Sequence, residues 1–319
     1  MHKRDSCCII KMYVANNEYY SIKTKIWTEF WKKSEKKMNL KIVADSTFSL
    51  SEDYVAAHGI TVVPLNVIID GIAYLDGIDI TLKEVMNAVY ADSKVSSSQP
   101  SPEVYRQTFL KLQAEGATDI LCLTISSTLS GSFGSASLAA REVPGLRIHL
   151  FDTLSTSVGA EMLAHLIIAE LDKGKSIEEA LAVGSEYREN STILMNMENL
   201  TVLKKSGRLS KIKATIGNLL RVKPIIEYIK GKNNVMSKFR TEKAVVEEII
   251  RRIKIDLTKA KSNFLIYISH VQAEEKIRRI KGIIEKAISG ITIQVSKEVS
   301  PVVAVNLGYS GFGIGWCYD

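Results

Sequence analysis

From residue 38 onward, short apolar runs rich in β-branched residues alternate with longer segments of helical periodicity. The strand-like runs lie at residues 38–44, 60–69, 119–125 and 146–151, and helical patterns lie at residues 81–91, 102–115 and 129–141. Strands that alternate with helices pair in parallel, because the chain must cross back over the sheet before the next strand begins. The sequence therefore predicts an α/β fold whose N-terminal domain contains a parallel sheet.

Two more helical segments, at 157–171 and 177–190, close the first half of the chain. The second half has a different pattern, which begins with a short helical segment at 200–207 and an apolar stretch at 216–230 that contains Pro224. They are followed by a charged helix at 242–259, strands at 264–269 and 291–296 around a helix at 273–287, and a glycine-rich run at 308–316. We expect an α/β domain at 38–190 packed against an α+β domain at 191–319.

The basic residues are concentrated at the N-terminus. Residues 1–37 hold nine Lys or Arg and four acidic residues, whereas the remaining 282 residues carry an excess of only two positive charges. A strongly basic nucleic-acid-binding face on the body is therefore not expected. We interpret residues 1–37 as an extension that is disordered or precedes a true start at Met38, the alternative being a basic arm for nucleic acid or an anionic membrane surface.

Composition and cysteine spacing indicate the cellular compartment and argue against some kinds of site. No run of about 18 uncharged apolar residues occurs, so we expect no stable membrane insertion. The four cysteines, Cys7, Cys8, Cys122 and Cys317, lack the spacing of a zinc site or a disulfide framework. We therefore expect a cytoplasmic protein without a metal or another cofactor.

Two clusters of hydroxyl side chains are the most informative local feature. One spans residues 96–102, and the other spans residues 126–132, directly after a predicted strand and before a helix. Loops at the carboxyl ends of parallel strands form binding crevices, and the free N–H groups of a helix N-terminus favour anions. Because no His or Lys adjoins either cluster, the pattern favours a holder for a carboxylate or phosphate over a nucleophile.

Six ordered motifs give the chain a resemblance to the DegV family, which supplies the fatty-acid-binding subunits of bacterial fatty acid kinase. The match runs from Met38 to the C-terminus, and residues 1–37 lie outside it. The motifs are Ala44-Asp45-Ser46-Thr47, Ser97-Ser98-Gln99-Pro100-Ser101, Ile125-Ser126-Ser127-Thr128-Leu129-Ser130-Gly131-Ser132, Phe151-Asp152-Thr153, Leu203-Lys204-Lys205-Ser206-Gly207-Arg208-Leu209-Ser210 and Lys223-Pro224-Ile225.

The resemblance implies a two-domain protein that encloses one long-chain fatty acid as its ligand and holds the carboxyl group between the domains. The carboxyl-binding positions of the family fall on Ser97 and Ser130, and the place of a family histidine is taken by Asn306. Weaker candidates at the same site are Ser98, Ser127 and Gly131. Arg208 is a weaker candidate for contacting the kinase, although its charge would equally suit a solvated surface.

Two departures from the family pattern should affect the contact with the carboxyl group differently. Ser97 keeps a hydroxyl where the family usually has threonine, whereas Asn306 cannot carry the positive charge of a histidine. A hydrogen bond to a charged group is worth about 1.5–3 kcal/mol, but burying a ~16-carbon chain contributes roughly 12 kcal/mol before other costs. We therefore expect binding to survive and presentation of the carboxyl group to be affected.

The leading hypothesis is a non-catalytic lipid-binding protein that presents a fatty acid to a separate ATP-using kinase subunit, which forms the acyl phosphate used in phospholipid synthesis. Apolar segments at 60–69, 158–171 and 216–226 could line the acyl tail. The alternative is a serine-dependent lipid or ester hydrolase that uses Ser130 with His270 as its base. The weakest hypothesis is the basic N-terminal arm acting on nucleic acid or a membrane.

Overall fold

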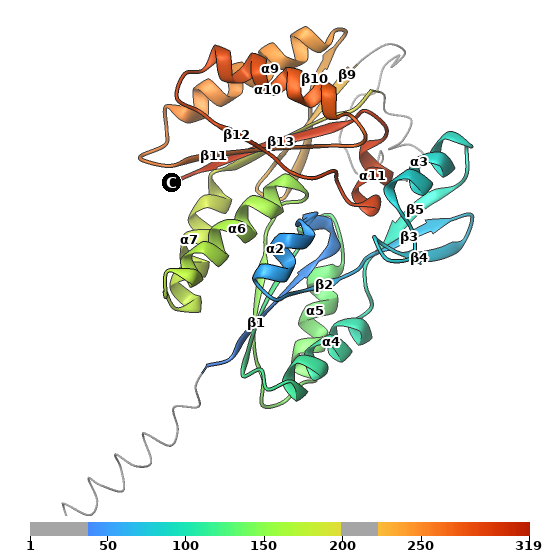
Figure 1. Ribbon diagram of the computed structural model, residues 1–319, viewed down its shortest axis with the longest axis vertical. Helices are drawn as coiled ribbons and strands as arrows, with labels where there is room; N and C mark the ends of the chain where they lie inside the picture. Colours follow the sequence, from blue (N-terminus) through green and yellow to red (C-terminus); the bar gives the residue numbers. More distant parts are fainter. Residues whose placement is uncertain (1–37, 199–222) are drawn as a thin grey trace, which may run out of the picture.

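The computed structural model describes residues 38–198 and 223–319, with the side chains of residues 234–238 left out. Three sheets meet around a central region, with the parallel sheet and the three-stranded sheet on one side and the six-stranded sheet on the other (Figure 1). The predicted fold class, an α/β N-terminal domain with a parallel sheet and a second domain, is confirmed. The predicted boundary near residue 190 stays a prediction.

A four-stranded parallel sheet forms the first layer, in the order β2-β1-β6-β7. Alternate residues of β1 face two different cores, because successive side chains in a strand point to opposite faces. Val43 packs with the helices α4 and α5, whereas Ile42 and Ala44 pack on the α6 side. The bounds are Leu40–Asp45 (β1), Ile60–Val63 (β2), Asp119–Thr124 (β6), Arg147–Asp152 (β7), Ser46–Phe48 (η1), Glu52–Ala57 (α2), Pro102–Ala114 (α4) and Ser132–Arg141 (α5).

The sequence prediction of one strand over residues 60–69 is wrong. Pro64 has no N–H to donate to a ladder, and the run divides there into β2 of the parallel sheet and β3 of a three-stranded antiparallel sheet. Residues 96–98, expected in a loop, belong to the strand β5 because they pair with β3. The order is β4-β3-β5, with bounds Asn66–Ile69 (β3), Ile72–Leu75 (β4), Val95–Ser98 (β5) and Leu82–Tyr90 for the adjoining helix α3.

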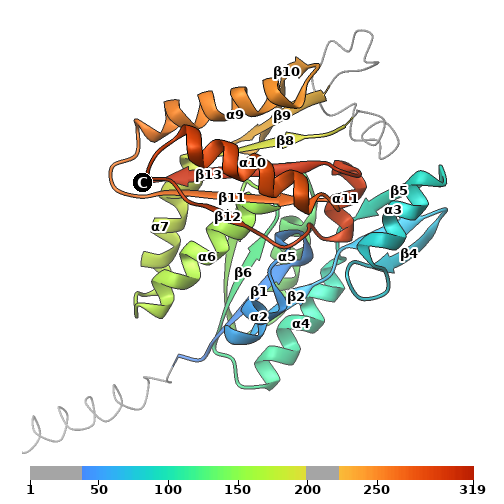
Figure 2. The ribbon, with the colours of Figure 1, turned by 45° about the horizontal axis from the view of Figure 1, so that its top comes forward.

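A six-stranded sheet, in the order β10-β9-β8-β13-β11-β12, forms the other layer. It is antiparallel except for the pair β11 and β12. Helices α9 and α10 cover its outer face, and α6 and α7 cover its inner face (Figure 2). The bounds are Ser191–Asn196 (β8), Lys223–Ile229 (β9), Lys232–Phe239 (β10), Phe264–His270 (β11), Ile293–Val295 (β12), Phe312–Tyr318 (β13), Val158–Asp172 (α6), Ile177–Glu189 (α7), Glu242–Leu257 (α9), Glu274–Ala287 (α10) and Pro301–Leu307 (α11).

Helix α6 joins the two large sheets. One hydrophobic core contains Leu121 and Leu123 of the parallel sheet, Leu163 of α6 and Ile193 of the six-stranded sheet. Gly315 on β13 allows the close approach, because a Cβ there would lie 3.1 Å from Val158 Cγ2. The glycine-rich C-terminal run therefore serves helix-to-sheet packing. None of the helices in the described part of the chain is long and apolar enough to span a bilayer.

The tight contact of α6 with β8 gives a stability prediction. A Cβ added to Gly159 would lie 2.8 Å from Ile193 Cγ1, so Gly159→Ala should destabilise the protein by about 1–3 kcal/mol through overpacking. The matched control is Gly134→Ala in α5, where no atom lies within 4 Å of the added methyl group. That variant should gain about 0.5–1 kcal/mol, because alanine is the better helix former. Urea unfolding measures both, and equal stabilities would contradict the described packing.

Candidate functional site

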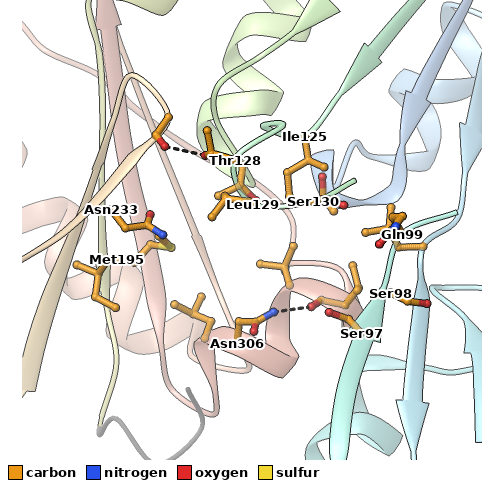
Figure 3. Close-up of a pocket in the computed structure, with 18 of the residues that line it drawn as sticks. Ser97, Ser98, Gln99, Ile125, Thr128, Leu129, Ser130, Met195, Asn233 and Asn306 are labelled. Atoms are coloured by element: carbon orange, nitrogen blue, oxygen red, sulfur yellow. Dashed lines mark hydrogen bonds between the residues drawn. The ribbon is translucent and has the colours of Figure 1, made fainter. Parts of the chain in front are cut away.

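A cavity of about 250 Å³ lies where the three sheets and α11 meet. Ser97, Ser98, Gln99 and Ser130 lie on one side of it, and Met195 and Asn233 lie on the opposite side (Figure 3). The cavity is lined by Thr47, Leu65, Ser97, Ser98, Gln99, Ile125, Thr128, Leu129, Ser130, Thr156, Met195, Met197, Ile226, Gly231, Asn233, Val302, Val303, Asn306 and Leu307.

The loop between β6 and α5 forms one wall of the cavity. It begins at Ile125, whose N–H donates to Asp45 Oδ2 at 2.7 Å. The hydroxyl groups of Ser130 and Ser132 lie 2.9 Å apart, and the N–H of Ser132 donates to Ser130 Oγ at 3.3 Å. The N–H groups of Leu129 and Ser130 donate to the carbonyl oxygen of Ser126, so these residues close a turn before α5 rather than forming the first turn of the helix that the sequence predicts.

Thr128 attaches this loop to the six-stranded sheet. Its hydroxyl group donates to the carbonyl oxygen of Gly231 at 2.6 Å and lies 2.8 Å from the hydroxyl group of Tyr228. Lys230 and Gly231 form the two-residue turn between β9 and β10, both with positive φ, as this type of hairpin requires. The contact thereby fixes the turn that precedes Asn233.

The strand β5 brings Ser97 and Ser98 to the cavity. Val67 pairs with Ser97 and Asn66 with Ser98, whose hydroxyl accepts a hydrogen bond of 3.3 Å from Asn66 Nδ2. Gln99 approaches Gly131 so closely that a Cβ at position 131 would lie 2.8 Å from its Nε2. Glycine at that position therefore lets the two hydroxyl-bearing segments meet.

Helix α11 brings Asn306 to the cavity and packs against β5. Its N-terminus is held by Asp76 Oδ1, which accepts a hydrogen bond of 2.8 Å from the N–H of Val302. Asn306 Nδ2 donates to the carbonyl oxygen of Val302 at 3.3 Å (Figure 3). Asn306 Oδ1 is buried without a hydrogen-bond partner, and so is Oδ1 of Asn233. Two residues that line the cavity thus each have a buried amide oxygen without a hydrogen-bond partner.

Two buried carboxyl groups lie behind the cavity wall. Burial raises the pKa of Asp45 to about 6, against the opposing effect of its hydrogen bonds from Thr47 and Ile125. Burial likewise raises the pKa of Asp76 to about 6. In residues 38–198 and 223–319, no group of three or more His, Cys, Asp and Glu side chains could hold a metal ion.

The structure brings four of the candidates together and separates the others. Ser97, Ser98, Ser130 and Asn306 line the cavity. Ser127 does not, because its N–H donates to Asp152 Oδ1 at 3.1 Å and its side chain is exposed. Gly131 contacts Gln99 without lining the cavity, and Arg208 lies outside the described residues.

Most residues of the segments expected to line the acyl tail do not line this cavity, and neither does the proposed catalytic base. Only Leu65 of segment 60–69 and Ile226 of the described part of segment 216–226 line the cavity. No residue of α6 does so, because its buried side chains fill the core between the sheets. His270 does not line the cavity either, and its Nδ1 accepts a hydrogen bond of 3.1 Å from the N–H of Ala273.

Thr156, Met195, Met197 and Asn233 line the cavity but were not predicted from the sequence. Asn233 follows a Lys-Gly turn that could have indicated a hairpin. No local pattern indicates which strand such a hairpin adjoins, and the pairing of β9 with β8 and the contact of Thr128 with Gly231 place it here.

Comparisons with known proteins agree with this architecture. A family model described as an uncharacterised protein of the DegV family matches residues 39–319. A DegV domain-containing protein of Staphylococcus aureus is 32% identical over 212 residues, which cover 66% of this chain and 75% of that relative. The resemblance to the DegV family is confirmed.

Two solved structures share the fold. One, described as showing fatty acid binding of a DegV family protein from Thermus thermophilus, has 29% identity and a TM-score of 0.80, covering 88% of this chain and 100% of the other. The second, a stearic acid-binding protein from Eubacterium ventriosum, has 27% identity and a TM-score of 0.80, covering 88% and 98%.

The hydrogen bond from Thr128 to Gly231, which bridges the β6–α5 loop and the six-stranded sheet, gives a prediction for the site. Thr128→Val keeps the shape of the side chain but leaves the carbonyl oxygen of Gly231 without this donor, which should lower the free energy of unfolding by about 1–3 kcal/mol. The control is Thr108→Val, whose exposed hydroxyl donates only to Val104 in its own helix. That variant should stay within about 0.5 kcal/mol of the wild type in urea unfolding. Equal losses in the two variants would argue against the bridge.

Proposed function

This chain belongs to the DegV family, and we propose that it binds one long-chain fatty acid and presents the carboxyl group to a fatty acid kinase for acyl-phosphate formation. The observation that carries the proposal is the uneven polarity of the cavity. Ser97, Ser98, Gln99 and Ser130 gather on the side of β5 and the β6–α5 loop, while Met195, Met197 and Ile226 supply apolar surface on the side of the six-stranded sheet, which also contributes Asn233. The fatty acids named for two solved relatives support the same ligand class.

The hydrocarbon tail supplies most of the affinity in this proposal. Burial of each CH₂ group contributes about 0.8 kcal/mol, so a ~16-carbon chain contributes roughly 12 kcal/mol before ordering costs. A hydrogen bond to the head group contributes about 0.5–3 kcal/mol, depending on its charge. The tail therefore provides affinity, and the polar groups set the orientation of the ligand.

Ser97, Ser130 and Asn306 are the proposed carboxyl contacts, with Ser98 next to them. The serine hydroxyl groups can donate to a ligand oxygen from two sides of the cavity. Both are held by backbone structure, Ser97 by the pairing of β5 with β3 and Ser130 by the turn before α5. The head group would thereby sit between two rigid elements at the place where the sheets meet.

In the proposed reaction, the kinase subunit carries out the phosphoryl transfer. A carboxylate oxygen of the ligand attacks the γ-phosphorus of ATP, the bond to the β,γ-bridging oxygen breaks, and acyl phosphate and ADP form. ATP and its binding site belong to the kinase subunit in this proposal, and the present chain orients the acceptor. A cytoplasmic location, where ATP is available, is part of the same proposal.

Lipid analysis tests the first half of the proposal. Protein purified from a bacterial host and extracted with organic solvent should release one long-chain fatty acid per chain, as measured by mass spectrometry. With a purified fatty acid kinase subunit and ATP, that acid should become an acyl phosphate, which hydroxylamine traps as a hydroxamate. Absence of any fatty acid would exclude the ligand class, whereas a bound acid without hydroxamate would exclude only the kinase role.

Substitution of the serines tests the orientation of the ligand. Ser97→Ala and Ser130→Ala should each weaken palmitate binding by about 3- to 100-fold, because each removes one hydrogen bond to the head group. The control is Ser137→Ala in α5, whose hydroxyl donates to Phe133 and does not line the cavity. Titration calorimetry measures the affinities, and a loss in the control as large as that in Ser97→Ala would place the head group elsewhere.

A further inference from the structure

Ser130 lines the cavity, but its side chain is hydrogen-bonded to a residue that does not. Ser132, the first residue of α5, is completely buried and lies behind the cavity wall. Its N–H donates to Ser130 Oγ at 3.3 Å, and the two hydroxyl groups lie 2.9 Å apart. Gly131, the N-cap residue of α5, has no side chain that could accept an N–H of the first helical turn. Ser130 accepts one in its place.

These contacts limit how Ser130 can meet a ligand. A serine hydroxyl group has one O–H to donate and two lone pairs that accept. One lone pair of Ser130 accepts the N–H of Ser132, and the 2.9 Å contact between the hydroxyl groups allows either oxygen to donate. When Ser132 donates, both lone pairs of Ser130 are occupied and its own O–H is left for the cavity. When Ser130 donates, no O–H is left for a ligand.

Tyr105 of α4 favours the arrangement in which Ser132 donates. Burial raises the pKa of Tyr105 well above its ordinary range, and the nearby hydroxyl group of Ser132 opposes that rise. The Tyr105 hydroxyl group otherwise lacks a hydrogen-bond partner in the described part of the chain. A buried O–H needs an acceptor, and Ser132 Oγ supplies one. Once Tyr105 donates to Ser132, the O–H of Ser132 remains for Ser130.

The place of this chain of hydroxyl groups adds to its polarity. Hydrogen bonds in a chain polarise one another, so each donor strengthens the next. Ser130 and Ser132 also lie at the N-terminus of α5, where the helix dipole favours negative charge. A ligand oxygen in front of Ser130 therefore meets a strengthened donor.

We propose that Tyr105 and Ser132 are positioning residues, which direct the O–H of Ser130 into the cavity by donating in sequence from Tyr105 to Ser132 and from Ser132 to Ser130. This inference rests on the proposed function and specifies how one carboxyl contact is oriented. Ser130 then acts only as a donor, which suits a carboxylate because its oxygens only accept.

A double-mutant cycle tests whether the two residues act through Ser130. Ser132→Ala keeps the backbone N–H but removes the hydroxyl group, and it should weaken palmitate binding by about 3- to 10-fold. Tyr105→Phe keeps the ring and should weaken binding by about 2- to 5-fold. In a Ser130→Ala background, each change should alter the affinity by less than about twofold, because no O–H is left to direct. Titration calorimetry measures the affinities, and urea unfolding checks that each variant is folded.

Ser135→Ala is the matched control, because Ser135 is a buried serine in the first turn of the same helix that does not line the cavity. Its affinity for palmitate should equal that of the wild type. A loss as large in Ser135→Ala as in Ser132→Ala would indicate a purely structural role and overturn the inference. So would losses from Ser132→Ala or Tyr105→Phe that persist undiminished in the Ser130→Ala background.

Carbon-13 NMR of carboxyl-labelled palmitic acid bound to the full chain reports on the head group itself. The carboxyl resonance should move in Ser132→Ala and Tyr105→Phe in the same direction as in Ser130→Ala, and it should stay unchanged in Ser135→Ala. Unchanged resonances in Ser132→Ala and Tyr105→Phe would overturn the inference alone. Failure of palmitic acid to bind to the wild type, or equal binding by the wild type and Ser130→Ala, would instead overturn the proposed head-group contact and, with it, this inference.

Discussion

The buried carboxyl group of Asp45 is the interaction on which the site depends. It lies at the end of β1 and accepts hydrogen bonds from Thr47 on one oxygen and from Ile125 on the other. It thereby fixes the segments that follow two neighbouring parallel strands, and each of these segments contributes to the cavity. Burial raises its pKa to about 6, so the geometry is held by a carboxyl group in an unfavourable environment.

Residues from the three-stranded and six-stranded sheets, the loops that follow the parallel strands and α11 line the cavity. The β6–α5 loop reaches the six-stranded sheet through Thr128, and α11 is fixed near the three-stranded sheet through Asp76. Helix α6 fills the core between the two larger sheets and leaves the cavity to be formed at their edge. A ligand at this point would contact elements that lie far apart in the sequence.

Much of the architecture could be predicted from local patterns. Continuous apolar runs rich in β-branched residues located the parallel strands, and period-3.6 signals located most of the helices, to within a few residues. The strand β5 was not predicted, since serine has little intrinsic preference for strands and the pairing of residues 95–98 with β3 makes this segment one. Pro64 is the local signal that two strands, and not one, occupy residues 60–69, because proline cannot donate to a strand ladder.

The sequence by itself determined the fold class, the family, and the presence of Ser97, Ser130 and Asn306 as polar groups of the right kind. Tertiary structure decided which of the candidates share a cavity, turning Ser127 outward through Asp152. It also decided that the amide oxygen of Asn306 has no partner and that no described charged residue lines the cavity. The reason is that hydrophobic periodicity is local, whereas the polarity of a cavity depends on contacts such as that of Thr128 with Gly231, 103 residues apart.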